Sequence, residues 1–207
     1  MNKIYILGMV YFLCLPQLAY SRECPNVLDQ QIPPQDFSTA PKGAIESVEK
    51  RHFTRKVEML ISGESASIVA DLHYTLNKFP NHYRALISLS NYDLQLKELT
   101  TSRQNEKLLK VDCYFKRAIQ FRPKDEKVRQ VYGIYMYKNK RFQEALESFF
   151  VAEKLGNNAE IEYHIGLTYN ALEDMDKAKD YAIRAYAKGY PLQGLKNKLL
   201  TKGVKLD

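Results

Sequence analysis

A self-match at a spacing of 33 residues is the feature that most limits how this chain can fold. The matching positions are Tyr132-Gly133 with Ile165-Gly166, Ala145 with Ala178, and Ala152 with Ala185. Between these positions the apolar residues keep the spacing of a helix. A repeat near this length is typical of helix pairs stacked in a row, because each pair buries its apolar face against the next pair. The repeat therefore favours a surface that holds other molecules over an active site.

Residues 1–21 are expected to be a cleaved secretory signal peptide. Lys3 precedes an apolar run that Pro16 ends, and Ala19-Tyr20-Ser21 places small residues where a signal peptidase reads the chain. The run of about 12 residues is shorter than the roughly 20 that a membrane-spanning helix needs. An uncleaved anchor is the alternative. We expect a periplasmic or secreted protein with no membrane span after signal cleavage.

Residues 22–42 are expected to form an extended leader, because four prolines in them disfavour a helix: Pro25, Pro33, Pro34 and Pro41. Signal cleavage would remove Cys14 and leave Cys24 and Cys113. In an oxidising compartment such a pair suggests one disulfide. Two unpaired thiols are the alternative.

Residues 43–207 are expected to form a series of helices. Either one helix or two short helices, the second with Thr54 as its N-cap, are expected between Gly43 and Gly63, and Ser65 is expected to begin the helix that Pro80 ends. The later helices are predicted at residues 81–96, 109–120, 126–138, 141–154, 159–171, 175–187 and 191–201, with Asp125 as a cap and Pro191 at the first position of the last helix. The polar loop at 97–107 is an insertion, either functional or merely tolerated.

The repeat resembles the tetratricopeptide (TPR) pattern, in which small residues lie where two helix axes approach closely. Residues 126–158 carry Tyr132-Gly133, Phe142, Ala145, Phe149 and Ala152 in phase, and residues 159–191 carry Ile165-Gly166, Tyr169, Ala178, Ala182 and Ala185. Residues 83–123 resemble a degenerate repeat, and residues 43–80 a partial one. The resemblance implies a right-handed TPR-like helical solenoid with a C-terminal capping helix, and it says almost nothing about function.

Four stretches also resemble a group of exported bacterial TPR proteins without an assigned activity. They are HFT at 52–54, FPNHYRAL at 79–86, CYFKRAIQFRP at 113–123 and GYPLQGLKNKL at 189–199. This second resemblance implies a location in the bacterial cell envelope. It implies no catalytic residues.

Patterns that carry catalysis or bind cofactors are missing from the sequence. The histidines are dispersed, without a second ligand at the spacing of a metal site: His52, His73, His82 and His164. There is no glycine-rich phosphate loop and no Gly-x-Ser-x-Gly turn. We therefore expect a protein that is not an enzyme and holds no cofactor or metal. The net charge of +7 is modest and spread out, so nucleic acid is not an expected partner, whereas an anionic envelope polymer is possible.

The expected binding surface consists of the inward-facing positions on the first helix of each pair. By helical phase these positions are Arg84, Ile87, Asn91, Lys127, Gln130, Ile134, Tyr137, Lys138, Tyr163, Leu167 and Asn170. Tyrosine and arginine are frequent at energetic hot spots, so Tyr137, Tyr163 and Arg84 are the preferred anchors. The alternative is that these residues pack against the leader or the terminal helix.

These patterns predict a scaffold or adaptor that holds a protein partner in a concave groove. Two alternatives remain open at this point. One is a structural subunit of an envelope assembly. The other is an accessory protein of polysaccharide or cell-wall machinery.

Overall fold

The computed structural model describes residues 24, 26–29, 33–99, 111–156 and 158–206, and every regular element within them is an α-helix. In chain order these helices are α1 (Lys42–His52), α2 (Arg55–Glu58), α3 (Ile68–Lys78), α4 (Tyr83–Leu99), α5 (Val111–Phe121), α6 (Glu126–Lys138), α7 (Phe142–Leu155), α8 (Ala159–Ala171), α9 (Met175–Ala187) and α10 (Gly194–Thr201). The predicted all-α class is confirmed for these residues. The predicted signal peptide lies outside them.

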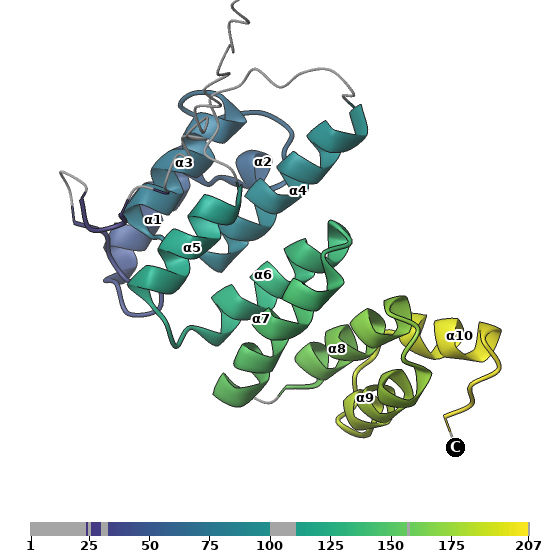
Figure 1. The fold of residues 1–207 in the computed structure, drawn as a ribbon. Helices are drawn as coiled ribbons and strands as arrows, with labels where there is room; N and C mark the ends of the chain where they lie inside the picture. Colours follow the sequence, from purple (N-terminus) through teal and green to yellow (C-terminus); the bar gives the residue numbers. More distant parts are fainter. Residues whose placement is uncertain (1–23, 25, 30–32, 100–110, 157, 207) are drawn as a thin grey trace, which may run out of the picture.

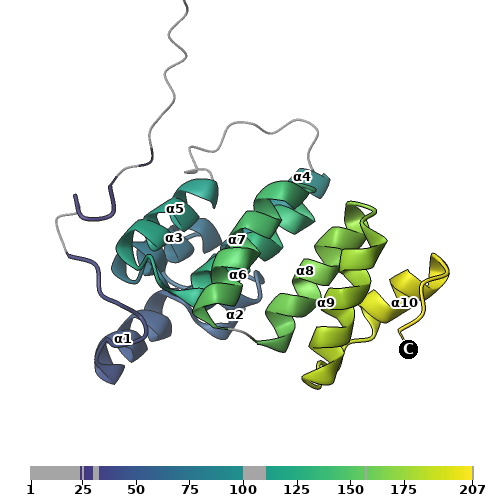
Figure 2. The ribbon, with the colours of Figure 1, turned by 60° about the horizontal axis from the view of Figure 1, so that its bottom comes forward.

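The helices form a row that follows the order of the chain (Figures 1 and 2). Helices α1–α5 lie at one end, the pair α6–α7 in the middle, and the pair α8–α9 beyond it. Helix α10 lies against α8 and α9 at the other end. The first helices of successive pairs are also neighbours, since α4 contacts α6 and α6 contacts α8. In the part of the chain that the structure describes, no helix is both long and apolar enough to cross a bilayer.

The 33-residue repeat is visible in the helix boundaries and turns. Helices α6, α8 and α9 begin and end at the predicted residues. Asp125 caps α6 as predicted, since its carboxylate accepts the Val128 N–H at 3.1 Å. Lys140 and Glu173, 33 residues apart, both adopt left-handed backbone angles, with φ of 61° and 63°. The two helix pairs therefore share the conformation of their connecting turn.

Two helix boundaries and one cap in the N-terminal half differ from the prediction. Helix α3 begins after Ser67 rather than at Ser65, because the N–H groups of Glu64, Ser65 and Ala66 donate to the buried Asp71 carboxylate and hold a turn there. Helix α4 continues to Leu99, so the loop expected at 97–107 starts later, and residues 100–107 lie outside the described residues. Thr54 precedes α2 but gives it no side-chain cap, because its hydroxyl donates to Glu64 instead.

The start of the last helix also differs from the prediction. Helix α10 begins at Gly194, three residues after Pro191. The Tyr186 hydroxyl donates to the Leu192 carbonyl at 3.0 Å and accepts the Lys196 N–H at 3.1 Å. These two bonds occupy backbone groups that an earlier helix start would need, so the segment after Pro191 stays non-helical.

A single repeat position explains how α10 joins the row. Phe149 packs against Gly133, where a Cβ atom would come within 2.5 Å of its ring. The residue 33 positions after Phe149 is Ala182, which leaves the matching space beside Gly166 without a ring. The fully buried Leu195 of α10 fills this space, with a methyl group 2.5 Å from where a Gly166 Cβ would lie. The terminal helix thus replaces a missing aromatic side chain.

The segment before α1 is fixed against the helices although it contains no helix in its described residues. The Phe37 N–H donates to the Asn81 side-chain oxygen at 2.9 Å, and the Asn81 side-chain NH₂ group donates to Asp36 at 2.7 Å and to Asp125 at 2.9 Å. The Phe37 ring lies 3.9 Å from the ring of His82, centre to centre. Asn81 therefore joins the leader to the start of α6.

Candidate functional site

One face of α4 carries a stripe of side chains that other helices leave partly open. The stripe consists of Ile87, Asn91, Leu94, Gln95 and Glu98, which recur at helical spacing. Ile87 is 39% exposed although it is a large apolar residue. Together with the end of α2 and of α6, the last four of these residues line a hollow of about 550 Å³; its other lining residues are Glu58, Met59, Leu60 and Lys138.

The hollow exists because α2 is short. Helix α2 has four residues, whereas α4 has 17 and α6 has 13. The Ser88 hydroxyl donates to the carbonyl of Glu58, the last residue of α2, at 2.9 Å. Ser88 therefore marks the level at which α2 ends along α4. Beyond Ser88, α4 continues to Leu99 without α2 beside it, over about 16 Å at 1.5 Å per residue.

On its other side α4 is bound to α6 by polar contacts. The Tyr135 hydroxyl donates to Asp93 at 2.9 Å, and the Lys97 ammonium lies 2.6 Å from the same carboxylate. Lys97 also donates to the Asn139 side chain at 2.7 Å. Burial, and then the hydrogen bond to Asp93, raise the pKa of Tyr135, so its hydroxyl stays a donor. This wall of the hollow is consequently well fixed.

Arg84, one of the predicted anchors, is 39% exposed but pairs with residues of its own chain and holds α2 on α4. Its guanidinium donates two hydrogen bonds to Glu58, both of 2.8 Å, and a third to Glu49 at 3.3 Å. It also lies 5.3 Å from the centre of the Phe53 ring. The hydrogen bonds from Arg84 lower the pKa of Glu58. Arg84 thus positions one wall of the hollow.

The predicted groove residues near α6 differ in how accessible they are. Asn91 and Lys138 line the hollow and contact each other, with the Lys138 ammonium donating to the Asn91 side chain at 3.2 Å. The exposed Lys127 donates to the buried Gln130 at 3.2 Å. Ile134 and Tyr137 are half-buried and pack against the core. The accessible part of the predicted groove is therefore its N-terminal part.

The three predicted groove residues on α8 are covered by the C-terminal segment. Tyr163 is 6% exposed, and its ring centre lies 4.3 Å from that of Tyr190. Leu167 belongs to the same apolar cluster as Leu195 and Leu199 of α10. Asn170 is buried, and its backbone carbonyl accepts a hydrogen bond from Lys202 at 3.3 Å. For these residues the structure supports the alternative, packing against the terminal helix.

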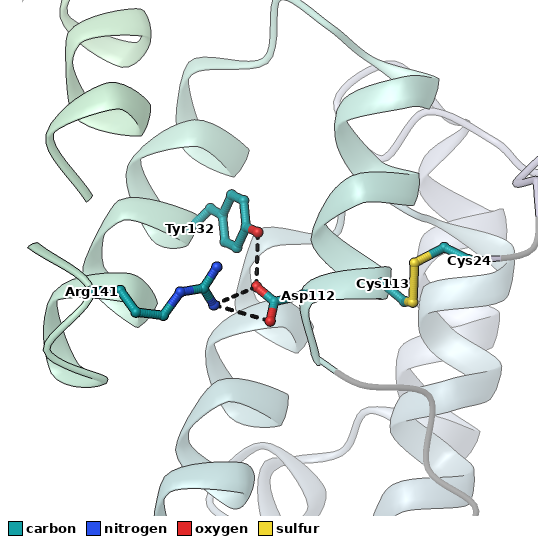
Figure 3. Close-up of a disulfide and its surroundings, with 5 residues drawn as sticks. All are labelled: Cys24, Asp112, Cys113, Tyr132 and Arg141. Atoms are coloured by element: carbon teal, nitrogen blue, oxygen red, sulfur yellow. Dashed lines mark hydrogen bonds and ion pairs between the residues drawn. A yellow bond between two sulfur atoms is a disulfide. The ribbon is translucent and has the colours of Figure 1, made fainter. Parts of the chain in front are cut away.

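Cys24 and Cys113 are joined by a disulfide across 89 residues of sequence, with their Cα atoms 5.2 Å apart. Figure 3 shows Cys113 pointing to the leader from one side of α5, while the adjacent Asp112 points to Tyr132 and Arg141 on the other side. Asp112 accepts the Tyr132 hydroxyl at 2.8 Å and Arg141 at 2.8 and 3.0 Å. Two successive residues therefore link α5 to the leader and to the α6–α7 pair.

The histidines have structural surroundings. His82 is fully buried, its Nδ1 accepts the Ala85 N–H at the start of α4, and its Nε2 lies 3.1 Å from Glu49. Burial lowers the pKa of His82 to about 3, so the ring is neutral and Nε2–H donates to Glu49. Within the described residues, no group of three or more His, Cys, Asp or Glu side chains is arranged to hold a metal ion.

No protein-family model, curated protein or solved structure matches the chain. The hollow is therefore assigned from geometry alone. Six residues that line the hollow are not among the predicted groove residues, namely Glu58, Met59, Leu60, Leu94, Gln95 and Glu98. Leu94, Gln95 and Glu98 could have been found, since they follow the predicted Asn91 by three, four and seven residues on the same helix face. Glu58, Met59 and Leu60 depend on where α2 ends.

Proposed function

We propose that this protein is a non-catalytic scaffold or adaptor of the bacterial cell envelope, which holds a protein partner in the hollow beside α4. The observation that carries the proposal is the open face of α4, where partly exposed apolar side chains and unlike charges surround one concave site. Apolar anchors inside a polar rim are typical of surfaces that bind proteins.

We further propose that the helix row is a TPR-like right-handed solenoid, with the concave side on α4, α6 and α8. The close packing of Gly133 against Phe149 supports this assignment, and so does the repeated turn at Lys140 and Glu173. In such a row the first helices of the pairs line one continuous face. The partner would then bind at the N-terminal part of that face.

The proposed location is the periplasm or the exterior, after removal of residues 1–21. The disulfide between Cys24 and Cys113 supports an oxidising compartment, because disulfides of this kind are rare in the cytosol. Mass measurement of the mature protein from cells tests the cleavage. A full-length mass would contradict it.

Photocrosslinking in living cells tests the binding function. A photoreactive amino acid in place of Gln95, which lines the hollow, is expected to give discrete adducts with one or a few proteins. Gln143 on α7 is a matched control, because it is also an exposed glutamine but lies outside the hollow. The Gln95 adducts are expected to disappear when Leu94 is changed to Glu. Equal adducts from both positions, or none from Gln95, would contradict the function.

A further inference from the structure

The hollow has the shape left by missing helix turns. Helix α4 is flanked by α6 along its length but by α2 only up to Ser88, which bonds to the last residue of α2. The next three turns of α4 have a helical neighbour on one side and the hollow on the other. Resting on the proposed function, we propose that the partner supplies an amphipathic α-helix that lies beside α4, in line with α2, and carries leucine-like apolar residues together with lysine or arginine.

The apolar side chains around the hollow suit the apolar stripe of such a helix. Met59 and Leu60, directly after α2, line the hollow, with Met59 56% exposed, and Leu94 faces the hollow from α4. These side chains lie on two walls, as they would around an inserted helix. Methionine adapts its shape to a docked side chain, because it is unbranched and polarisable. A helix of about three turns spans the 16 Å of uncovered α4 and places apolar residues at i, i+3 or i+4, and i+7.

Helix α10 shows how a short helix fits against another pair of this chain. It has eight residues and buries Leu195 and Leu199, four residues apart, against α8 and α9. Leu167 of α8 is buried in the same cluster as these two leucines. The uncovered turns of α4 offer a similar length of helix. A continuation of the α2–α4 interface by a helix is therefore better supported than an extended peptide.

The charge at the Glu98 end of the hollow favours a basic residue at that end of the partner helix. Glu58 is neutralised by its two hydrogen bonds with Arg84. Lys138 lies on the α6 side and donates to Asn91. The exposed Glu98 forms no ion pair or hydrogen bond with any residue that the structure describes. A lysine or arginine near the end of the partner helix would pair with Glu98, which sets the orientation of the helix.

Peptide selection on the full chain tests the proposal. A displayed library of random 14-residue peptides is selected on the wild-type protein and counter-selected on Met59→Glu. The enriched peptides are expected to carry apolar residues at i, i+3 or i+4, and i+7 with at least one lysine or arginine, and to become helical on binding. Their Kd is expected to rise at least tenfold with Met59→Glu. It should rise several-fold with Glu98→Lys, more at low salt than at high salt.

Leu192→Glu is the matched control, since Leu192 is 57% exposed, close to the 56% of Met59, and lies outside the hollow. This variant should bind the peptides like the wild type. The proposal would be overturned if no sequence is enriched or if the enriched peptides are acidic or non-helical. It would also be overturned if Met59→Glu and Leu192→Glu bind the peptides alike. A dimer of the chain alone that Met59→Glu dissociates would also overturn it, because the occupant would then be a second copy.

The two proposals fail in different ways. Protein adducts at Gln95 combined with non-helical peptides would contradict the proposed partner helix but leave the proposed binding function standing. Absence of adducts in cells would contradict the proposed binding function itself, whatever the peptides show.

Discussion

The inward face of the helix row is covered at one end of the molecule and open at the other. On α8 the inward residues are covered, and Tyr163 is 6% exposed beneath the segment that leads into α10. On α4 the corresponding face is open, with Ile87 39% exposed and a hollow farther along. The difference arises from the neighbours, because α10 fills its place on α8 while α2 ends too early to cover α4. Availability for binding is thus decided by what the chain places next to a helix face.

The largest expected loss of stability comes from a substitution at the covered end. Leu195→Ala removes the fully buried side chain that packs on Gly166, so we expect a loss of about 2–5 kcal/mol in the free energy of unfolding. The half-buried Leu94, changed to Ala, should cost less than about 1 kcal/mol. Urea unfolding of both variants measures the difference. Equal losses would mean that the two ends are not packed differently.

The second effect concerns the end with the disulfide. Replacing Cys24 and Cys113 with alanine removes a cross-link over 89 residues, and we expect a loss of about 2–4 kcal/mol. Hydrogen exchange should accelerate in the leader and α5, while α8–α10 stay protected because they contact neither cysteine. Uniform acceleration along the chain would show that the two ends unfold as one unit.

The third effect compares the two close helix contacts. Gly133→Leu is expected to cost about 1–3 kcal/mol, because the new side chain meets the fully buried ring of Phe149. Gly166→Leu should cost less, because it meets a methyl group of Leu195 on a terminal helix that can shift. Thermal or urea unfolding ranks the two variants. The reverse order would indicate that α10 is held as firmly as α7.

The last comparison is the pH dependence, to which each end contributes one histidine whose pKa is lowered by burial. Burial lowers the pKa of His82 to about 3 and that of His164 to about 4, below the unfolded value of 6.5. Between these values the unfolded chain binds more protons than the folded one. The free energy of unfolding should therefore fall as the pH drops below 6.5, by at most about 1.4 kcal/mol per pH unit for each histidine.

His82→Asn keeps a side chain that can accept the Ala85 N–H and removes the titrating ring, so it should flatten this pH dependence. His164→Asn is the counterpart at the other end. Unfolding in urea at several pH values between 7 and 4 measures both. An unchanged slope in His82→Asn would mean that this ring is protonated in the folded protein.

Much of the fold could be predicted where the repeat is regular. The bounds of α6, α8 and α9 follow from apolar periodicity combined with a capping Asp or Asn, which are local signals. The starts of α3 and α10 could not be predicted in this way, because they depend on hydrogen bonds to the side chains of Asp71 and Tyr186. Such contacts involve side chains whose positions are set by packing rather than by neighbouring sequence.

The candidate site was predicted only in part for the same reason. Helical phase placed Asn91 and Lys138 on the open face correctly, but it placed Tyr163 on that face as well. Phase tells which side of a helix a residue occupies and not whether another segment covers it. The one signal for the covering was Ala182 in the position of Phe149, which leaves room for Leu195.

From the bonds that fix the leader we predict an order of folding. Phe37 and Asp36 form hydrogen bonds with Asn81 across 44 and 45 residues, and the disulfide joins Cys24 to Cys113 across 89 residues. Contacts between distant residues form late, because the chain between them must first be made and its loop closed. By contrast, α6 with α7 and α8 with α9 can close as soon as each hairpin exists. The segment that the ribosome makes before the helices is therefore positioned after α5, so the row is completed at its beginning.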